Sequence, residues 1–283
     1  MLATLIVVFR EVLEASLVVG IVMVATRGVP GRGRWILAGC AAGVLGAIVV
    51  AAFAGELASL VQGAGQELFN AGVLFAAVAM LGWHNIWMSR HGRELALDAS
   101  RIGKEVLAGS RPMYALSLVC GIALLREGSE VVLFLYGIVV AGDSTLGGMV
   151  LGGALGVLAG LAVGAALYLG LLAIPMRYLF GATSILILLL AAGMASQGAA
   201  FLAAANILPS LGDSLWDTSS ILAERSMAGQ MLHVLAGYTA RPEGIQLAFY
   251  LGTLLIIGTF MRLARAEPPA DRPTRTPAVP EVR

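Results

Sequence analysis

The chain has 283 residues, of which 59% are hydrophobic and 12% are charged, and its formal net charge is +1. Soluble domains carry about 25% charged residues, so this composition excludes an ordinary soluble protein. The small net charge also gives no electrostatic basis for binding nucleic acid. Apolar runs of about 20 residues recur without the strict alternation of a membrane β-barrel. We therefore expect an all-α polytopic membrane protein embedded in the lipid bilayer.

Seven apolar stretches are long enough to cross a bilayer as helices. The first is interpreted as a span and not as a signal peptide, because no basic segment precedes it and Arg10 and Glu11 interrupt its apolar sequence. The predicted spans cover roughly 2–25, 35–55, 67–88, 113–141, 146–174, 178–205 and 245–263.

Basic residues gather in alternate loops between these spans. The loops after the first and third spans are the most basic, with Arg27, Arg32 and Arg34 in one and Arg90, Arg93, Arg101, Lys104 and Arg111 in the other. Because such loops face the cytoplasm, we predict a multi-pass protein of the cytoplasmic (inner) membrane. Its N-terminus would lie outside and its C-terminus inside.

The first and fourth spans each contain an Arg-Glu-x-x-Glu motif, at 10–14 and at 126–130. A charged residue at membrane depth costs at least ~2.5–3.5 kcal/mol, so six of them would cost roughly 15–21 kcal/mol if they were unpaired and faced lipid. That exceeds the stability of a typical domain, about 5–15 kcal/mol. These charges must therefore face each other, water or an ion.

The two motif-bearing spans run in opposite directions through the membrane, and each opens a group of three spans. This arrangement predicts an inverted repeat of three plus three spans, followed by one more, with a substrate site near the midplane. The expected transmembrane core covers 1–205 and is made of repeats at 1–88 and 113–205. It is followed by an extracytoplasmic segment at 206–244, with a short amphipathic helix within 220–235. A seventh transmembrane helix at 245–265 and a disordered cytoplasmic tail at 266–283 complete the chain.

The spacing of the motif places its charged groups together. Residues three or four apart share a helix face, so the two glutamates of each motif point the same way and each arginine can reach the second glutamate. If the two spans are adjacent, four carboxylates and two guanidiniums converge with a net charge of −2. Carboxylate oxygens suit hard cations such as Mg²⁺, Ca²⁺, Mn²⁺ or Fe³⁺, and no thiolate or imidazole is expected in this site. The predicted metal ligands are Glu11, Glu14, Glu127 and Glu130, and Arg10 and Arg126 adjust the charge.

Other interpretations of the motif stay open. The charges could form structural ion pairs that hold the two spans together, or a proton relay. A di-metal carboxylate enzyme normally has Glu-x-x-His on two of its helices, and neither motif has a histidine three residues after a glutamate. The presence of two copies at corresponding places favours a cation site.

Seven further polar residues are weaker candidates for the transport pathway: Ser129, Tyr136, Gln197, Glu56, Glu67, Asp143 and His233. The first two could add oxygen ligands beside the second motif. Gln197 could line the pathway or hydrogen-bond between helices. The three acidic residues lie at outer ends of spans, as a solvated rim or a funnel for cations, and His233 could be a surface residue instead. His84 and Asn85, near the inner end of the third span, could line an exit for the ion, but packing at the interface is the favoured interpretation.

Glycine recurs at every fourth position from 148 to 164 in the fifth span, and at 39 and 43 in the second. Rows of small residues let two helices approach closely. We expect these rows to pack against neighbouring helices and so to support the motif helices.

The duplicated motif in the first and fourth of seven spans resembles the high-affinity iron permeases. This family includes the fungal oxidase-dependent iron transporter and the bacterial Efe-type permeases. The resemblance covers roughly 1–264, includes the runs at 83–88, 216–219, 229–233 and 237–242, and is closer to the bacterial branch. It implies that the four motif glutamates bind iron during translocation. It also implies an extracytoplasmic redox or iron-delivery partner protein.

We therefore predict an iron permease that moves iron ions across the cytoplasmic membrane into the cell. Iron would be the transported substrate, with no tightly bound organic cofactor and no enzymatic activity. One alternative is a permease for another divalent metal, such as lead or manganese. Another is a non-transporting membrane subunit whose ion pairs are structural.

Overall fold

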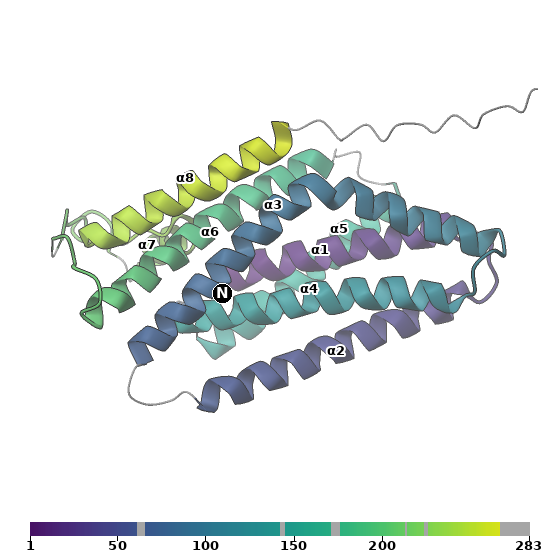
Figure 1. Ribbon diagram of the computed structural model, residues 1–283, viewed down its shortest axis with the longest axis horizontal. Coiled ribbons are helices and arrows are strands. Elements are labelled where there is room, and N and C mark those ends of the chain that lie inside the picture. The colour runs from purple at the N-terminus through teal and green to yellow at the C-terminus, as the bar shows by residue number, and fades with distance from the viewer. Residues whose placement is uncertain (61–65, 142–144, 171–175, 213, 224–225, 267–283) are drawn as a thin grey trace, which may run out of the picture.

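The computed structural model describes residues 1–60, 66–141, 145–170, 176–212, 214–223 and 226–266. Every regular element within these residues is a helix, which confirms the predicted all-α fold. The helices form an elongated bundle (Figure 1). They are α1 (Leu2–Ala25), α2 (Arg32–Leu60), α3 (Gln66–Leu107), α4 (Tyr114–Val140), α5 (Leu146–Tyr168), α6 (Met176–Ala204), α7 (Met227–Ala236) and α8 (Gly244–Ala266).

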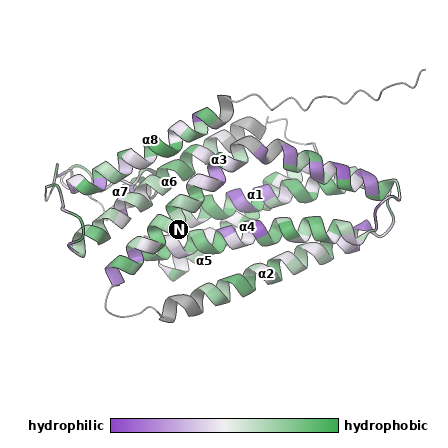
Figure 2. Ribbon diagram, in the orientation of Figure 1, coloured by the Kyte–Doolittle hydropathy of each residue, from purple (hydrophilic) through white to green (hydrophobic). Residues whose placement is uncertain are grey.

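Five stretches of helix are long and apolar enough to cross a membrane, one each in α2, α3, α5, α6 and α8. The remaining two long helices, α1 and α4, have 24 and 27 residues. Each carries the three charged residues of its motif within an otherwise apolar sequence. Figure 2 shows these hydrophilic segments in the middle of α1 and α4, with hydrophobic ribbon on both sides.

The apolar stretch of α3 ends at Met88, close to the predicted end of the third span, but the helix itself continues to Leu107 and has 42 residues. At about 1.5 Å per residue it is roughly twice as long as the ~30 Å hydrocarbon core. The polar second half of the helix contains an ion pair, in which Arg101 Nη2 lies 3.2 Å from Asp98 Oδ1. The segment interpreted as a basic loop is therefore largely helical, and Figure 1 shows α3 changing direction along its length.

The glycine rows bring the helices together as expected. Helix α5 packs along α1, and α2 packs along α4. A Cβ atom on Gly160 would lie 2.9 Å from Val12 Cβ, and one on Gly43 would lie 2.7 Å from Leu124 Cβ. Real Cβ atoms do not approach so closely, so both positions require glycine at this separation. Each motif helix is therefore held by a helix from the other half of the chain.

Two apolar clusters lie on either side of the motifs. One includes Val7 of α1 and Phe134 of α4, together with side chains of α3 and α6. The other includes Val22 of α1 and Cys120 of α4, together with side chains of α2 and α3. Along both α1 and α4 the charged motif falls between the residues of the two clusters. The charged layer is thus enclosed by apolar packing at both ends.

The segment between α6 and α8 contains α7, a helix of 10 residues that overlaps the short amphipathic helix predicted within 220–235. The Ser226 hydroxyl accepts a hydrogen bond from Gly229 N at 3.0 Å and caps the start of α7. Gly237, with a φ of 64°, ends it. Tyr250 of α8 donates from its hydroxyl to Ala236 O at 2.6 Å, so α7 is anchored to the last helix. The predicted tail lies almost wholly outside the described residues.

Candidate metal centre

The first motif is buried in the centre of α1. The Arg10 guanidinium lies 3.0 Å from Glu11 Oε1 through Nη1 and 3.0 Å from Glu14 Oε1 through Nε. The side chains of Arg10 and Glu11 are 2% and 0% exposed. Helical spacing brings Glu14 back to Arg10. The motif therefore forms a compact ion-pair group that is closed to solvent.

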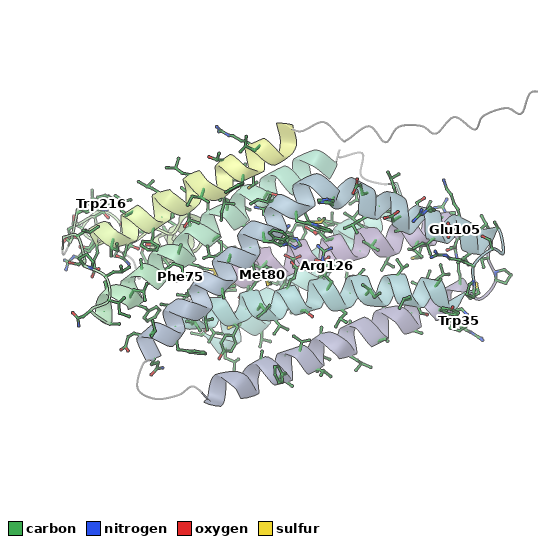
Figure 3. All side chains as sticks on the ribbon, viewed as in Figure 1. Trp35, Phe75, Met80, Glu105, Arg126 and Trp216 are labelled. Atoms are coloured by element: carbon green, nitrogen blue, oxygen red, sulfur yellow. The ribbon has the colours of Figure 1, made fainter. Side chains whose placement is uncertain are left out.

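The second motif lies beside the first, on α4. Arg126 donates from Nε to Glu130 Oε1 at 3.2 Å and lies 3.6 Å from Glu127 Oε1. Its guanidinium carbon also stands 4.5 Å from the ring centroid of Trp87 on α3. Figure 3 shows Arg126 in the middle of the bundle. This arginine is 31% exposed, so the second motif is more open than the first.

His84 of α3 connects the two motifs. Its Nδ1 atom contacts Glu130 Oε2 on α4, and its Nε2 atom lies 3.5 Å from Glu14 Oε2 on α1. The imidazole is 3% exposed. Three helices therefore contribute ionisable side chains to a single buried group.

The ligand atoms of this group are close enough to surround one ion. Glu11, His84, Glu127 and Glu130 each offer one atom, and these atoms all lie within 4.8 Å of one another. Glu14 borders the cluster through His84. Within the described part of the chain, Glu11 Oε2, Glu127 Oε2 and His84 Nε2 are buried without a hydrogen-bond partner. Buried polar atoms normally have a partner, and a bound cation would provide one for all three.

Comparison with known proteins assigns the chain to a family. A model of the iron permease FTR1 family matches residues 1–265. The chain belongs to the iron permease FTR1 family. It is 28% identical over 255 residues to the ferrous iron permease EfeU of Yersinia pestis, which covers 88% of this chain and 89% of that protein. The EfeU proteins of Escherichia coli O6:K15:H31 (strain 536 / UPEC) and Shigella sonnei (strain Ss046) are each 28% identical over 261 residues, covering 88% of this chain and 91% of each relative. No solved structure matches the chain.

Membership of the iron permease FTR1 family confirms the resemblance noted in the sequence. It assigns the chain to iron transport, because the family is one of permeases. Together with the helices that are long and apolar enough to cross a membrane, it makes the chain a multi-pass membrane protein. The family match covers nearly the whole described chain, including both motifs and His84.

The structure brings all four predicted glutamates and both arginines into one region. It corrects one expectation, because the site contains an imidazole that the motif spacing did not suggest. His84 lies near the end of the apolar stretch of α3 at Met88, as predicted, but its side chain is buried between the two motifs. An ionisable residue within an apolar span was the available signal. Its neighbour Asn85 is also buried inside the bundle and donates from Nδ2 to Ser184 O on α6 at 3.0 Å.

The weaker candidates are mostly separate from this centre. Ser129 donates from Oγ to Leu125 O of its own helix at 2.7 Å, and Tyr136 is half-buried further along α4. Gln197 and His233 line one small hollow between α6, α7 and residues 237–239. Glu67 is exposed at the start of α3. The Glu56 side chain and Asp143 lie outside the described residues.

Proposed function

We propose that the chain moves iron ions across the cytoplasmic membrane into the cell, through the centre formed by its two motifs. The observation that carries this proposal is the convergence of ligand atoms from α1, α3 and α4 within 4.8 Å of one another. Unpartnered carboxylate oxygens in a buried site are suited to a multivalent cation. The relatives named ferrous iron permeases support Fe²⁺ as the transported ion.

We further propose that α1 and α4 cross the membrane with the other five long helices, in an inverted repeat. Their lengths of 24 and 27 residues are sufficient, since about 20 residues span the hydrocarbon core. The packing of α5 on α1 and of α2 on α4 supports the repeat, because the second helix of each half contacts the first helix of the other. We include the predicted regions in this proposed topology. We also include the predicted orientation, with the N-terminus outside and the C-terminus inside.

The two apolar clusters suggest how the ion is transported. Because they enclose the charged layer at both ends, an ion in the centre is shielded from water on either side. Transport then requires the cluster around Phe134 to separate for entry and the cluster around Cys120 to separate for release. The two arginines reduce the negative charge of the glutamates, so the centre holds an ion without trapping it. An extracytoplasmic redox or iron-delivery partner would supply iron from the outer side, as the resemblance implies.

Uptake by the purified protein tests this proposal. Proteoliposomes containing the wild-type chain should accumulate radiolabelled Fe²⁺, and the Glu11→Ala and Glu127→Ala variants should not. Asp98→Ala is the matched control, because that exposed carboxylate pairs with Arg101 in the polar half of α3, outside the centre, and it should transport normally. Normal uptake by both centre variants would contradict the site.

Competition in the same vesicles separates the alternatives. An excess of unlabelled Mn²⁺ or Pb²⁺ should reduce Fe²⁺ uptake less than an excess of unlabelled Fe²⁺ does. Stronger inhibition by Mn²⁺ or Pb²⁺ would identify a permease for another metal. A wild-type chain that inserts correctly but accumulates no metal would indicate the non-transporting subunit.

A further inference from the structure

We propose that His84 is a direct ligand of the transported ion and makes the centre select transition-metal ions such as Fe²⁺ over Mg²⁺ and Ca²⁺. This inference rests on the proposed function, because it concerns the same centre. It assigns a role to a residue of α3 that belongs to neither motif.

The surroundings of His84 match those of a metal-binding histidine. Such a histidine typically directs one ring nitrogen to a carboxylate and binds the metal through the other. Here Nδ1 contacts Glu130 Oε2, and Nε2 is buried without a hydrogen-bond partner among the described residues. Nε2 lies 3.5 Å from Glu14 Oε2, so an ion bound at the imidazole would also approach the first motif. The ring is oriented by one motif and directed toward the other.

The imidazole is the cluster's only source of a nitrogen ligand within the described residues. The nearby arginines cannot take that role, because a guanidinium has donors and no lone pair to offer. Oxygen-only sites suit Mg²⁺ and Ca²⁺, whereas imidazole suits iron, nickel, copper and zinc. Removing His84 would leave a carboxylate site that still binds hard cations. The selectivity of the centre would then depend on this one side chain.

His91 provides a matched control on the same helix. It lies two turns beyond His84, and its ring is stacked on Trp87 with 5.0 Å between centroids and an interplanar angle of 18°. Its Nδ1 atom is 3.2 Å from Trp87 O, and it does not belong to the ligand cluster. Substituting His91 therefore removes an imidazole from α3 without removing a member of the ligand cluster.

The experiment uses the full chain in lipid nanodiscs with Mn²⁺ as a paramagnetic probe. Pulsed electron paramagnetic resonance reports whether a nitrogen is bound directly to Mn²⁺, and competition by Fe²⁺ and by Mg²⁺ gives their relative affinities. The wild type should show nitrogen coupling, His91→Gln should keep it and His84→Gln should lose it. The preference for Fe²⁺ over Mg²⁺ should fall at least ~10-fold in His84→Gln.

Each other outcome contradicts a specific claim. If His84→Gln keeps the nitrogen coupling or the Fe²⁺ preference, the inference about His84 is wrong, whereas iron transport through the motif glutamates still stands. If the wild type binds neither Mn²⁺ nor Fe²⁺, the proposed function fails as well. Should His84→Gln not fold, isotope-labelled histidine in a His91→Gln, His233→Gln double variant tests ligation directly. The chain has three histidines, so His84 is then the only source of a label-dependent coupling, and its absence would overturn the inference.

Discussion

The two copies of the Arg-Glu-x-x-Glu motif have the same charged residues in different surroundings. On α1, the side chains of Arg10 and Glu14 are 2% and 3% exposed. On α4, those of Arg126 and Glu130 are 31% and 15% exposed. Helix α1 is covered by α3, α4 and α5, whereas Arg126 rests on a tryptophan ring near the edge of the centre. The comparison shows that the neighbouring helices, and not the motif sequence, determine how exposed the charged side chains of each motif are.

This difference suggests a division of roles between the two halves. The α1 half is held by ion pairs inside the bundle and by the glycine row of α5. The α4 half contains the more exposed arginine, which pairs with Glu127 and Glu130. We interpret α1 as the fixed part of the centre and α4 as the part through which the ion gains access.

The largest expected effect on stability is the difference between substituting Arg10 and substituting Arg126. Arg10→Met leaves buried carboxylates without their cation, and breaking a buried pair in this way costs about 3–5 kcal/mol. Arg126→Met removes a half-exposed partner and should cost only about 1–2 kcal/mol. Thermal unfolding of the purified variants measures both. Equal destabilisation would contradict the difference between the halves.

A smaller effect is expected where α5 supports α1. Gly160→Ala would place a Cβ 2.9 Å from Val12 Cβ and 3.0 Å from Phe9 O, and overpacking of this kind costs about 1–3 kcal/mol. Gly153→Ala is the matched control on the same helix, because its nearest contact would be 3.9 Å, to Thr4 Cγ2. Gly160→Ala should lose stability and uptake while Gly153→Ala keeps both. If Gly160→Ala were as stable as the control, α5 would not fix α1.

The stacking of Arg126 on Trp87 should have a more modest role. Trp87→Leu removes a cation–π contact worth about 0.5–2 kcal/mol and should reduce the rate of Fe²⁺ uptake without abolishing binding. Trp83→Leu, one turn earlier on α3, replaces a ring that is 71% exposed and should leave uptake unchanged. Initial uptake rates in proteoliposomes compare the two. The same rate in both variants would show that Trp87 does not position Arg126.

The smallest effect is expected for an ion pair in the segment between α6 and α8. Asp217 accepts hydrogen bonds from Ser219 and lies 2.9 Å from Arg241, and these contacts lower its pKa to about 2. The ionised carboxylate therefore stabilises the fold above the unfolded value of about 3.9, and this contribution is lost as pH falls toward 2. Asp217→Asn should lower the melting temperature slightly at neutral pH, and the difference from wild type should shrink between about pH 4 and pH 2. A pH-independent difference would exclude this role for the carboxylate.

The sequence predicted most of this arrangement because its signals are local. Apolar runs located the long helices, and four-residue glycine spacing located the close contacts of α5. The motif spacing placed the glutamates on one face of each helix. The contact between α1 and α4 followed only from the assumption of a repeat. The full length of α3 was not predicted. Its charged second half was interpreted as a loop because it is polar, although it is rich in helix-forming residues.

The part of the centre that the sequence did not predict depends on tertiary packing. His84 enters the cluster because α3 crosses both motif helices, and no spacing within α3 encodes that crossing. The contact between Arg126 and Trp87 arises in the same way. The different exposure of the two motifs likewise has no local signal, since both have the same charged residues at the same spacing.

The central claim is that both motifs and His84 hold a single ion, and anomalous scattering at the iron edge tests it most directly. Crystals of the full chain loaded anaerobically with Fe²⁺ should show one strong peak in coordination contact with Glu11, Glu127, Glu130 and His84. The peak should disappear in Glu127→Ala and persist in Asp98→Ala. A peak elsewhere, for example in the hollow lined by Gln197 and His233, with none in the centre, would contradict the account.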